Sequence, residues 1–196
     1  MNNNLGDKLI DELFDNPLEF YNKGKSLQLL EECFNGFSLE TLLPLFSHEN
    51  LYVRRAAIWI ASELGSKGTC FIDNAIALLK DDDRYVKHYA LEVIAVCSIG
   101  ENLHKFINVV SFLECEDEIL DDLVMMLISN ANKYQLEEGV KYYTEKETYN
   151  KLHYEGLTKL IEIDDVTREQ VELMLKSDEA LVKKYGNIIA KKKFSD

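Results

Sequence analysis

Histidine and cysteine are the side chains in this sequence that are best suited to bind a transition metal. No two histidines are four residues apart, the spacing that places two imidazoles on one face of a helix, and no H-E-x-x-H motif occurs. The cysteines form no C-x-x-C pair, which indicates free thiols in a reducing compartment. We therefore expect no metal site among His48, His88, His104, His153, Cys33, Cys70, Cys97 and Cys115.

The sequence also lacks the common nucleophile and phosphate-binding motifs. It contains neither the G-x-S-x-G turn that exposes a catalytic serine nor the G-x-x-x-x-G-K-[ST] loop that surrounds a phosphate. We therefore expect no catalytic residues and no cofactor, and we predict that the protein is not an enzyme.

The densest group of carboxylates lies between Glu114 and Asp122. It lacks the D-x-[DN]-x-[DN]-G spacing of a calcium loop. The helix dipole favours acidic side chains in the first turn of a helix, which is one explanation for the group. The alternative is a docking patch for a basic partner, with Asp121 and Asp122 among its contact residues.

The composition is that of a folded, acidic protein. Of the 196 residues, 46% are hydrophobic and 29% are charged, and the formal net charge is −13. Such a charge repels phosphate backbones and anionic lipid, whereas it complements a basic protein. We therefore expect a basic protein as partner, and neither nucleic acid nor membrane. No basic and apolar leader is evident and no apolar run could span a bilayer, so we expect a cytoplasmic location.

The chain contains an internal repeat. Residues 52–58 (YVRRAAI) resemble residues 85–91 (YVKHYAL), which follow 33 positions later. The apolar positions recur at the same spacing in residues 119–127 and more weakly in residues 152–160, and residues 182–186 echo them again. A period of this length is typical of stacked helical hairpins.

Each copy is expected to form a helix, a short loop and a second helix. Asn50 and the capping box from Thr167 to Gln170 are typical helix starts, and Gly65 is a typical helix stop. Spacings of three and four place one apolar face on the second helix of the first clear copy: Val53, Ala56, Ala57, Ile60, Ala61 and Leu64. Small residues recur at one register, where they would let the two helices of a hairpin approach closely: Ala57, Ala90, Gly156 and Gly186.

Residues 42–46 (LLPLF), 53–57 (VRRAA) and 64–65 (LG) resemble a HEAT repeat. In that family a proline bends the first helix, a Val-Arg or Val-Lys pair begins the second, and an acid lies six residues before the basic residue. Asp81 and Lys87 fit the last feature. The clear resemblance covers residues 38–99, and the rest of the chain matches by apolar register only.

The resemblance implies an all-α fold, namely a right-handed α-α superhelix of about five to six HEAT-like hairpins. It also implies a single domain over residues 1–196. The clear units lie near residues 38–66 and 70–99, and the weaker units near residues 5–36, 103–131, 135–163 and 167–193.

In arrays of this kind the second helices line a concave surface, where we expect a binding strip. The column that contains Trp59 should face outward, because it also contains the charged Glu92; the alternative for Trp59 is a place in the core. Trp, Tyr and Arg are frequent in binding hot spots. The predicted partner-binding residues are Arg55, Trp59, His88, Glu92, Asp121, Asp122, Met125 and Tyr154.

The function expected from these features is a non-catalytic protein–protein interaction, for example that of a bacterial immunity protein that neutralises a basic toxin. A second hypothesis follows from residues 52–58, which also resemble HEAT-like alkylpurine DNA glycosylases; Arg55 and Trp59 would then face DNA. The single tryptophan and the charge of −13 oppose it. A third hypothesis is a scaffold or a cofactor-lyase-like chaperone, although nothing in the sequence marks a tetrapyrrole site.

Overall fold

The computed structural model describes residues 5–145 and 150–194, and every regular element in these two ranges is a helix. The all-α class expected from the sequence is therefore confirmed. The chain divides into two compact units, an N-terminal unit of residues 1–97 and a C-terminal unit of residues 98–196. None of the described helices is long and apolar enough to cross a membrane.

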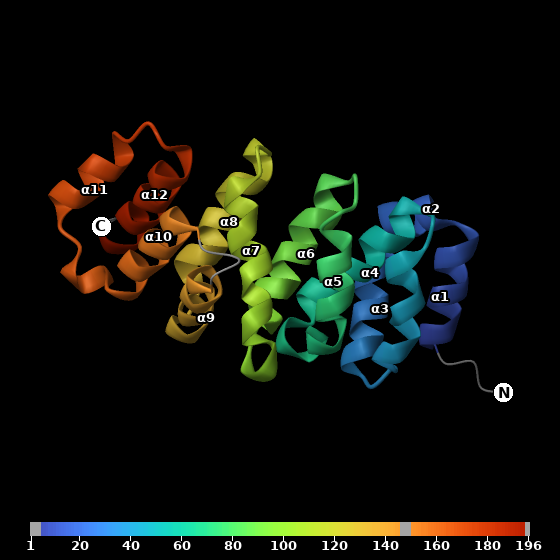
Figure 1. The fold of residues 1–196 in the computed structure, drawn as a ribbon. Helices are drawn as coiled ribbons and strands as arrows, with labels where there is room; N and C mark the ends of the chain where they lie inside the picture. Colours follow the sequence, from blue (N-terminus) through green and yellow to red (C-terminus); the bar gives the residue numbers. More distant parts are fainter. Residues whose placement is uncertain (1–4, 146–149, 195–196) are drawn as a thin grey trace. The chain divides into compact units, whose positions relative to one another are not determined.

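The N-terminal unit is built from helices that pack on their neighbours in the sequence. Both α3 and α6 contact α4, and η1 contacts α4 and α5. Residues 38–66 contain η1 and α4, and residues 70–99 contain α5 and α6. The elements are α1 (Leu5–Asp15), α2 (Pro17–Asn22), α3 (Lys25–Phe34), the 3-10 helix η1 (Leu39–Ser47), α4 (Leu51–Glu63), η2 (Gly65–Phe71), α5 (Ile72–Leu78) and α6 (Arg84–Cys97) (Figure 1).

Helix α4 forms as its sequence predicts. Asn50 caps it, because the side-chain Oδ1 accepts a hydrogen bond from the N–H of Tyr52 at 2.9 Å. The predicted apolar face is buried, and Ile58 is buried as well because α3, α6 and η1 all pack against this helix. Pro44 lies inside η1, where its missing N–H and the clash of its ring with the carbonyl four residues earlier disfavour a regular α-helix.

Two arginines of α4 connect the two hairpins. The Nε of Arg54 donates to Oδ2 of Asp81 at 2.6 Å, and the Nε of Arg55 donates to Oδ1 of Asp83 at 3.0 Å. Both carboxylates lie in the loop before α6, so the pairs fix α4 to the beginning of that helix. Asp81, the acid that fits the HEAT pattern, therefore contacts an arginine of the preceding copy.

The C-terminal unit begins with short helical segments and continues with longer helices. Asp117, Asn132, Asn150 and Thr167 each cap a helix through the side chain, and the capping box predicted from Thr167 to Gln170 is confirmed. The elements are η3 (Gly100–Phe106), α7 (Ile107–Ser111), η4 (Phe112–Glu114), α8 (Glu118–Asn130), α9 (Lys133–Thr144), α10 (Lys151–Ile161), η5 (Ile163–Asp165), α11 (Arg168–Leu175) and α12 (Ala180–Phe194).

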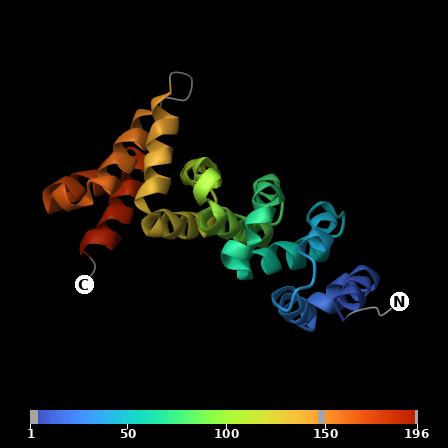
Figure 2. The same ribbon diagram turned by 90° about the horizontal axis from the view of Figure 1, so that it is seen from below.

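Helix α12 organises this unit, because it packs against α8, α10 and α11 (Figure 2). Lys184 of α12 forms an ion pair with Asp121 of α8 at 2.8 Å, and its Nζ donates to the carbonyl of Leu113 at 2.7 Å. Near the end of the helix, Lys193 donates to the carbonyls of Ile163, Asp164 and Val166, each at 2.7 Å. Helix α12 thus connects α8 with η5 and the residue that follows it, Val166.

Two glycines allow close packing around α12. A Cβ on Gly186 would lie 3.0 Å from Cβ of Met174 in α11, so the expected close approach of the two helices in this hairpin is confirmed. A Cβ on Gly156 would instead lie 2.3 Å from the ring of Tyr185. Gly156 therefore makes room for an aromatic side chain of α12.

Candidate functional site

Four of the predicted partner-binding residues lie on two adjacent helices of the N-terminal unit. Arg55 and Trp59 are one turn apart on α4, and His88 and Glu92 are one turn apart on α6. Because α4 packs against α6, the repeat register brings these side chains into one neighbourhood. All four are partly exposed. Trp59 therefore lies at the surface of the unit and not in its core.

Arg55 already has partners within its own unit. Its Nη2 lies 2.5 Å from Oδ2 of Asp83, and its guanidinium lies 5.0–5.9 Å from the ring centroids of Tyr21, Tyr52 and Tyr85. Burial alone would raise the pKa of Asp83, but hydrogen bonds from Arg55 and from the N–H of Val86 bring this pKa below its usual value. The hydrogen bond that Arg55 donates to Asp83 likewise raises the pKa of Arg55. Arg55 is thus a caged cation with a structural role.

Beside this cage lies an open hollow of about 370 Å³, here called the aromatic hollow. Trp59 of α4, Tyr89 of α6 and Tyr21 of α2 supply its rings, and Leu27 of α3 lies in its wall with 53% of its surface exposed. Gly24 and Ser26 complete the lining. Gly24 adopts a left-handed conformation with φ of 66°, which turns the chain from α2 into α3.

Ser26 gives the aromatic hollow a polar group without a partner. The residue is only 7% exposed, and its Oγ has no hydrogen-bond partner among the described residues. A buried hydroxyl of this kind costs free energy until a donor or acceptor reaches it. The lining of the aromatic hollow therefore includes one hydroxyl whose hydrogen-bonding capacity is unused.

Two glutamates, Glu63 and Glu92, act electrostatically on Tyr89 of the aromatic hollow. Burial raises the pKa of Glu92, and the negative charge of Glu63 raises it further, whereas the charge and hydrogen bond of His88, 3.5 Å away, lower it. Burial also raises the pKa of Tyr89, with smaller contributions that include Tyr21 and both glutamates. Since the guanidinium nearby is paired with an aspartate, the surroundings of the aromatic hollow favour a cation.

The other four predicted residues belong to the C-terminal unit and have different environments. Asp121 is paired with Lys184, Asp122 is exposed, and Tyr154 is partly exposed. Met125 is only 8% exposed, so the prediction that its column faces outward is wrong at this position. It lies in the core because α8 is covered by α12. Partner binding by the exposed members stays a prediction.

The acidic group has local roles in the structure. Asp117 caps α8 by accepting from the N–H of Ile119 at 3.1 Å, as the helix-dipole explanation leads one to expect. Glu114 accepts hydrogen bonds from Asn150 at 3.1 Å and from His153 at 2.8 Å. These contacts account for part of the group, and a docking role for the group stays a prediction.

The hydrogen-bonded network around His153, a residue that is fully buried, was not predicted from the sequence. Its Nδ1 lies 2.8 Å from Oη of Tyr185, its Nε2 lies 2.8 Å from Oε1 of Glu114, and its ring stacks on Tyr143 with centroids 4.4 Å apart. The carboxylate accepts from Nε2–H, so Nδ1 accepts from the tyrosine hydroxyl. Burial lowers the pKa of His153, although the hydrogen bond and charge of Glu114 raise it.

This network holds the C-terminal unit together. Tyr185 is 1% exposed, so its hydroxyl has no access to a substrate, and burial raises its pKa well above the usual value. The one sequence signal for this network is that Tyr185 occupies the same position of the repeat as Tyr89. The partner Glu114 is 39 residues from His153, which no local pattern reveals.

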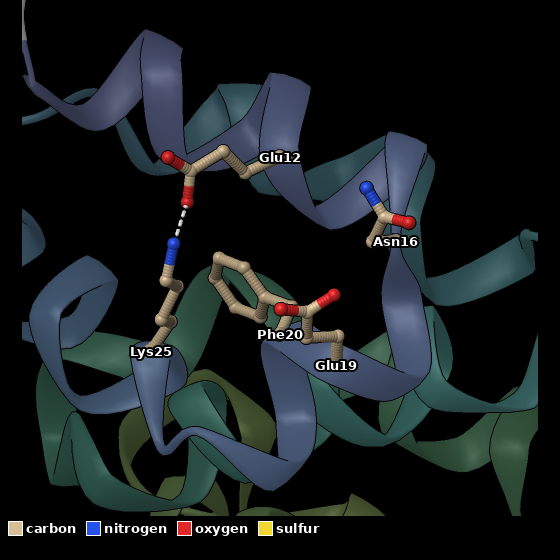
Figure 3. Close-up of a pocket in the computed structure, with 5 residues that line it drawn as sticks. All are labelled: Glu12, Asn16, Glu19, Phe20 and Lys25. Atoms are coloured by element: carbon tan, nitrogen blue, oxygen red, sulfur yellow. Dashed lines mark hydrogen bonds and ion pairs between the residues drawn. The ribbon is translucent and has the colours of Figure 1, made fainter.

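A second hollow in the N-terminal unit has a polar lining, shown in Figure 3. Lys25 forms an ion pair with Glu12, and the buried Phe20 lies between the side chains of Lys25 and Glu19 in this view. Glu19 is paired with Lys23. Because these charges already have partners within the chain, this hollow offers less to a ligand than the aromatic hollow.

No group of three or more histidine, cysteine or acidic side chains in residues 5–145 and 150–194 could hold a metal ion. The four cysteines are free thiols, and burial raises the pKa of Cys33 to about 11. Comparison with known proteins gave no match to a family model and none to a curated protein sequence.

Proposed function

We propose that this chain is a HEAT-like helical-repeat protein that binds a basic protein partner without catalysing a reaction. The contact surface is the face of α4 and α6 around Trp59, together with the adjoining α2 and α3. The observation that carries this proposal is the aromatic hollow, to which Trp59, Tyr21 and Tyr89 contribute rings and where the carboxylates of Glu63 and Glu92 act electrostatically on Tyr89.

The repeat arrangement supports the first part of the proposal. In the N-terminal unit the two clearest copies form successive helical pairs, joined by the contact between Arg54 and Asp81. The buried positions of α4 and α6 follow the expected register, with Val53 and Val86 both fully buried. An array of this kind exposes one continuous face of helices, and solenoids commonly use such a face to bind partners.

The chemistry of the surface supports the second part. Tryptophan and tyrosine supply large, rigid contact areas at interfaces, where they are frequent hot spots. The net charge of −13 speeds association with a basic protein and repels nucleic acid. The aromatic hollow itself contains no cluster of nucleophile, base and orienting residue, so binding is the function that its residues support.

A capture experiment tests the proposal. The tagged chain is used at low salt to isolate partners from native cells, and each candidate is then purified and mixed with the chain alone. Leu27→Lys adds a positive charge at an exposed position of the aromatic hollow, so the fold is retained while a basic partner is repelled.

Tyr134→Ala is the matched control, because Tyr134 is 68% exposed and lies on α9 of the other unit. We expect a basic protein that binds the original chain and Tyr134→Ala but not Leu27→Lys. Equal binding to all three proteins would refute the proposed surface. Isolation of nucleic acid alone would refute a protein partner and favour the DNA glycosylase hypothesis.

A further inference from the structure

We propose that the aromatic hollow accepts a single lysine or arginine side chain of the protein partner. The carboxylates of Glu63 and Glu92 serve as its counter-charges, and the Oγ of Ser26 accepts one of its N–H groups. This inference rests on the proposed function and names the chemical group that the surface recognises.

The arrangement of the rings is the first argument. Tyr21, Trp59 and Tyr89 come from α2, α4 and α6 and line one hollow of about 370 Å³, which has room for a side chain. The face of an aromatic ring attracts a cation, most strongly in the case of tryptophan.

The neighbouring cage supplies the second argument, because it shows the same chemistry already in use. The guanidinium of Arg55 lies against three tyrosine rings and is paired with Asp83. Tyr21 belongs both to this cage and to the lining of the aromatic hollow. The aromatic hollow repeats the combination of tyrosine rings and a nearby carboxylate, but it contains no cation of its own among the described residues.

The polar groups exclude the other classes of occupant. An apolar side chain would leave the Oγ of Ser26 buried without a partner. An acidic side chain would be repelled by Glu63 and Glu92. A cationic side chain satisfies the hydroxyl and relieves the mutual repulsion of the two carboxylates, which contributes to the raised pKa of Glu92.

The test uses the one tryptophan of the sequence as its reporter. Its indole N–H gives a single resolved signal in a proton–nitrogen correlation spectrum of the full chain. The probes are the N-acetyl amides of lysine, arginine, norleucine and glutamate, together with spermidine as a free polyamine. Norleucine matches the lysine stem without its charge, so the comparison isolates the contribution of the cation.

We expect the lysine and arginine probes to shift the indole signal saturably, with Kd in the range of about 1–10 mM for ligands of this size. The norleucine probe should bind about tenfold more weakly, and the glutamate probe should cause no shift. Glu92→Gln and Ser26→Ala should each weaken lysine binding by about threefold to tenfold. Tyr134→Ala should leave it unchanged.

Several results would overturn the inference. Equal binding of norleucine and lysine would show an apolar site, and binding of the glutamate probe would show an anion site. Tighter binding of spermidine than of the lysine probe would identify a free polyamine as the occupant. If none of the probes shifts the signal while the isolated partner still requires Leu27 to be uncharged, the inference fails and the proposed function stands.

Discussion

The hydroxyl of Tyr185 is the clearest point at which to test the structure of the C-terminal unit. It donates to Nδ1 of His153 at 2.8 Å, and the two residues are 1% and 0% exposed. Tyr185→Phe keeps the ring beside Gly156 and removes only this hydrogen bond. The imidazole nitrogen would then be buried without a donor, because the other nitrogen is held by Glu114.

The expected cost follows from that geometry. Leaving one buried acceptor unsatisfied costs about 1–3 kcal/mol of unfolding free energy. For a protein of this size each kcal/mol corresponds to a fall in Tm of about 2–4 °C. Tyr143→Phe is the matched control, since the Tyr143 hydroxyl has no hydrogen bond to the described residues and its ring still stacks on His153. The control should cost less than about 0.5 kcal/mol.

Urea unfolding followed by circular dichroism measures both changes. The m-value of each variant should match that of the original chain, so that a shift of the midpoint reports stability. The reasoning is refuted if Tyr185→Phe and Tyr143→Phe lose the same free energy. It is also refuted if the signal of the His153 imidazole does not change in Tyr185→Phe.

Three further predictions concern stability. Burial lowers the pKa of His153 below its ordinary value of 6.5, so below that pH the unfolded chain takes up a proton that the folded chain does not. The unfolding free energy should therefore fall as the pH drops below about 6.5. His153→Gln should reduce that fall, which urea titrations at several pH values would measure. Gly156→Ala should destabilise the chain by more than about 1 kcal/mol, because the new Cβ would lie 2.3 Å from the ring of Tyr185, whereas Gly139→Ala meets only a flexible leucine methyl at 2.9 Å and should show a smaller fall in Tm. Glu92→Gln should raise unfolding free energy at pH 7 by a few tenths of a kcal/mol, because its charge is costly where burial raises its pKa; a loss of stability in calorimetry would contradict this.

The features that the sequence predicted correctly depend on neighbours along the chain. The apolar face of α4, the Asn50 cap and the capping box at Thr167 are read from spacings of two to four residues. The 33-residue repeat places Trp59 and Glu92 at one register on two helices, α4 and α6, which pack against each other.

The features that it missed depend on contacts between distant residues. Met125 is buried and Asp121 is paired because α12 returns to pack on α8, and Lys184 is 63 residues from its aspartate. The aromatic hollow needs Tyr21, which lies outside the clear copies of the repeat. A periodic pattern predicts which face of a helix is apolar, but it does not specify which helix covers that face.

The central claim is that the surface around Trp59 binds a basic protein. Isothermal titration calorimetry with the purified partner tests it most directly, comparing the original chain with Trp59→Ala and with Tyr134→Ala, after circular dichroism has shown that both variants are folded. Loss of a tryptophan hot spot costs about 2 kcal/mol or more, so Trp59→Ala should weaken Kd by about 30-fold, and Tyr134→Ala should leave it unchanged. Equal affinity of all three proteins would contradict the claim.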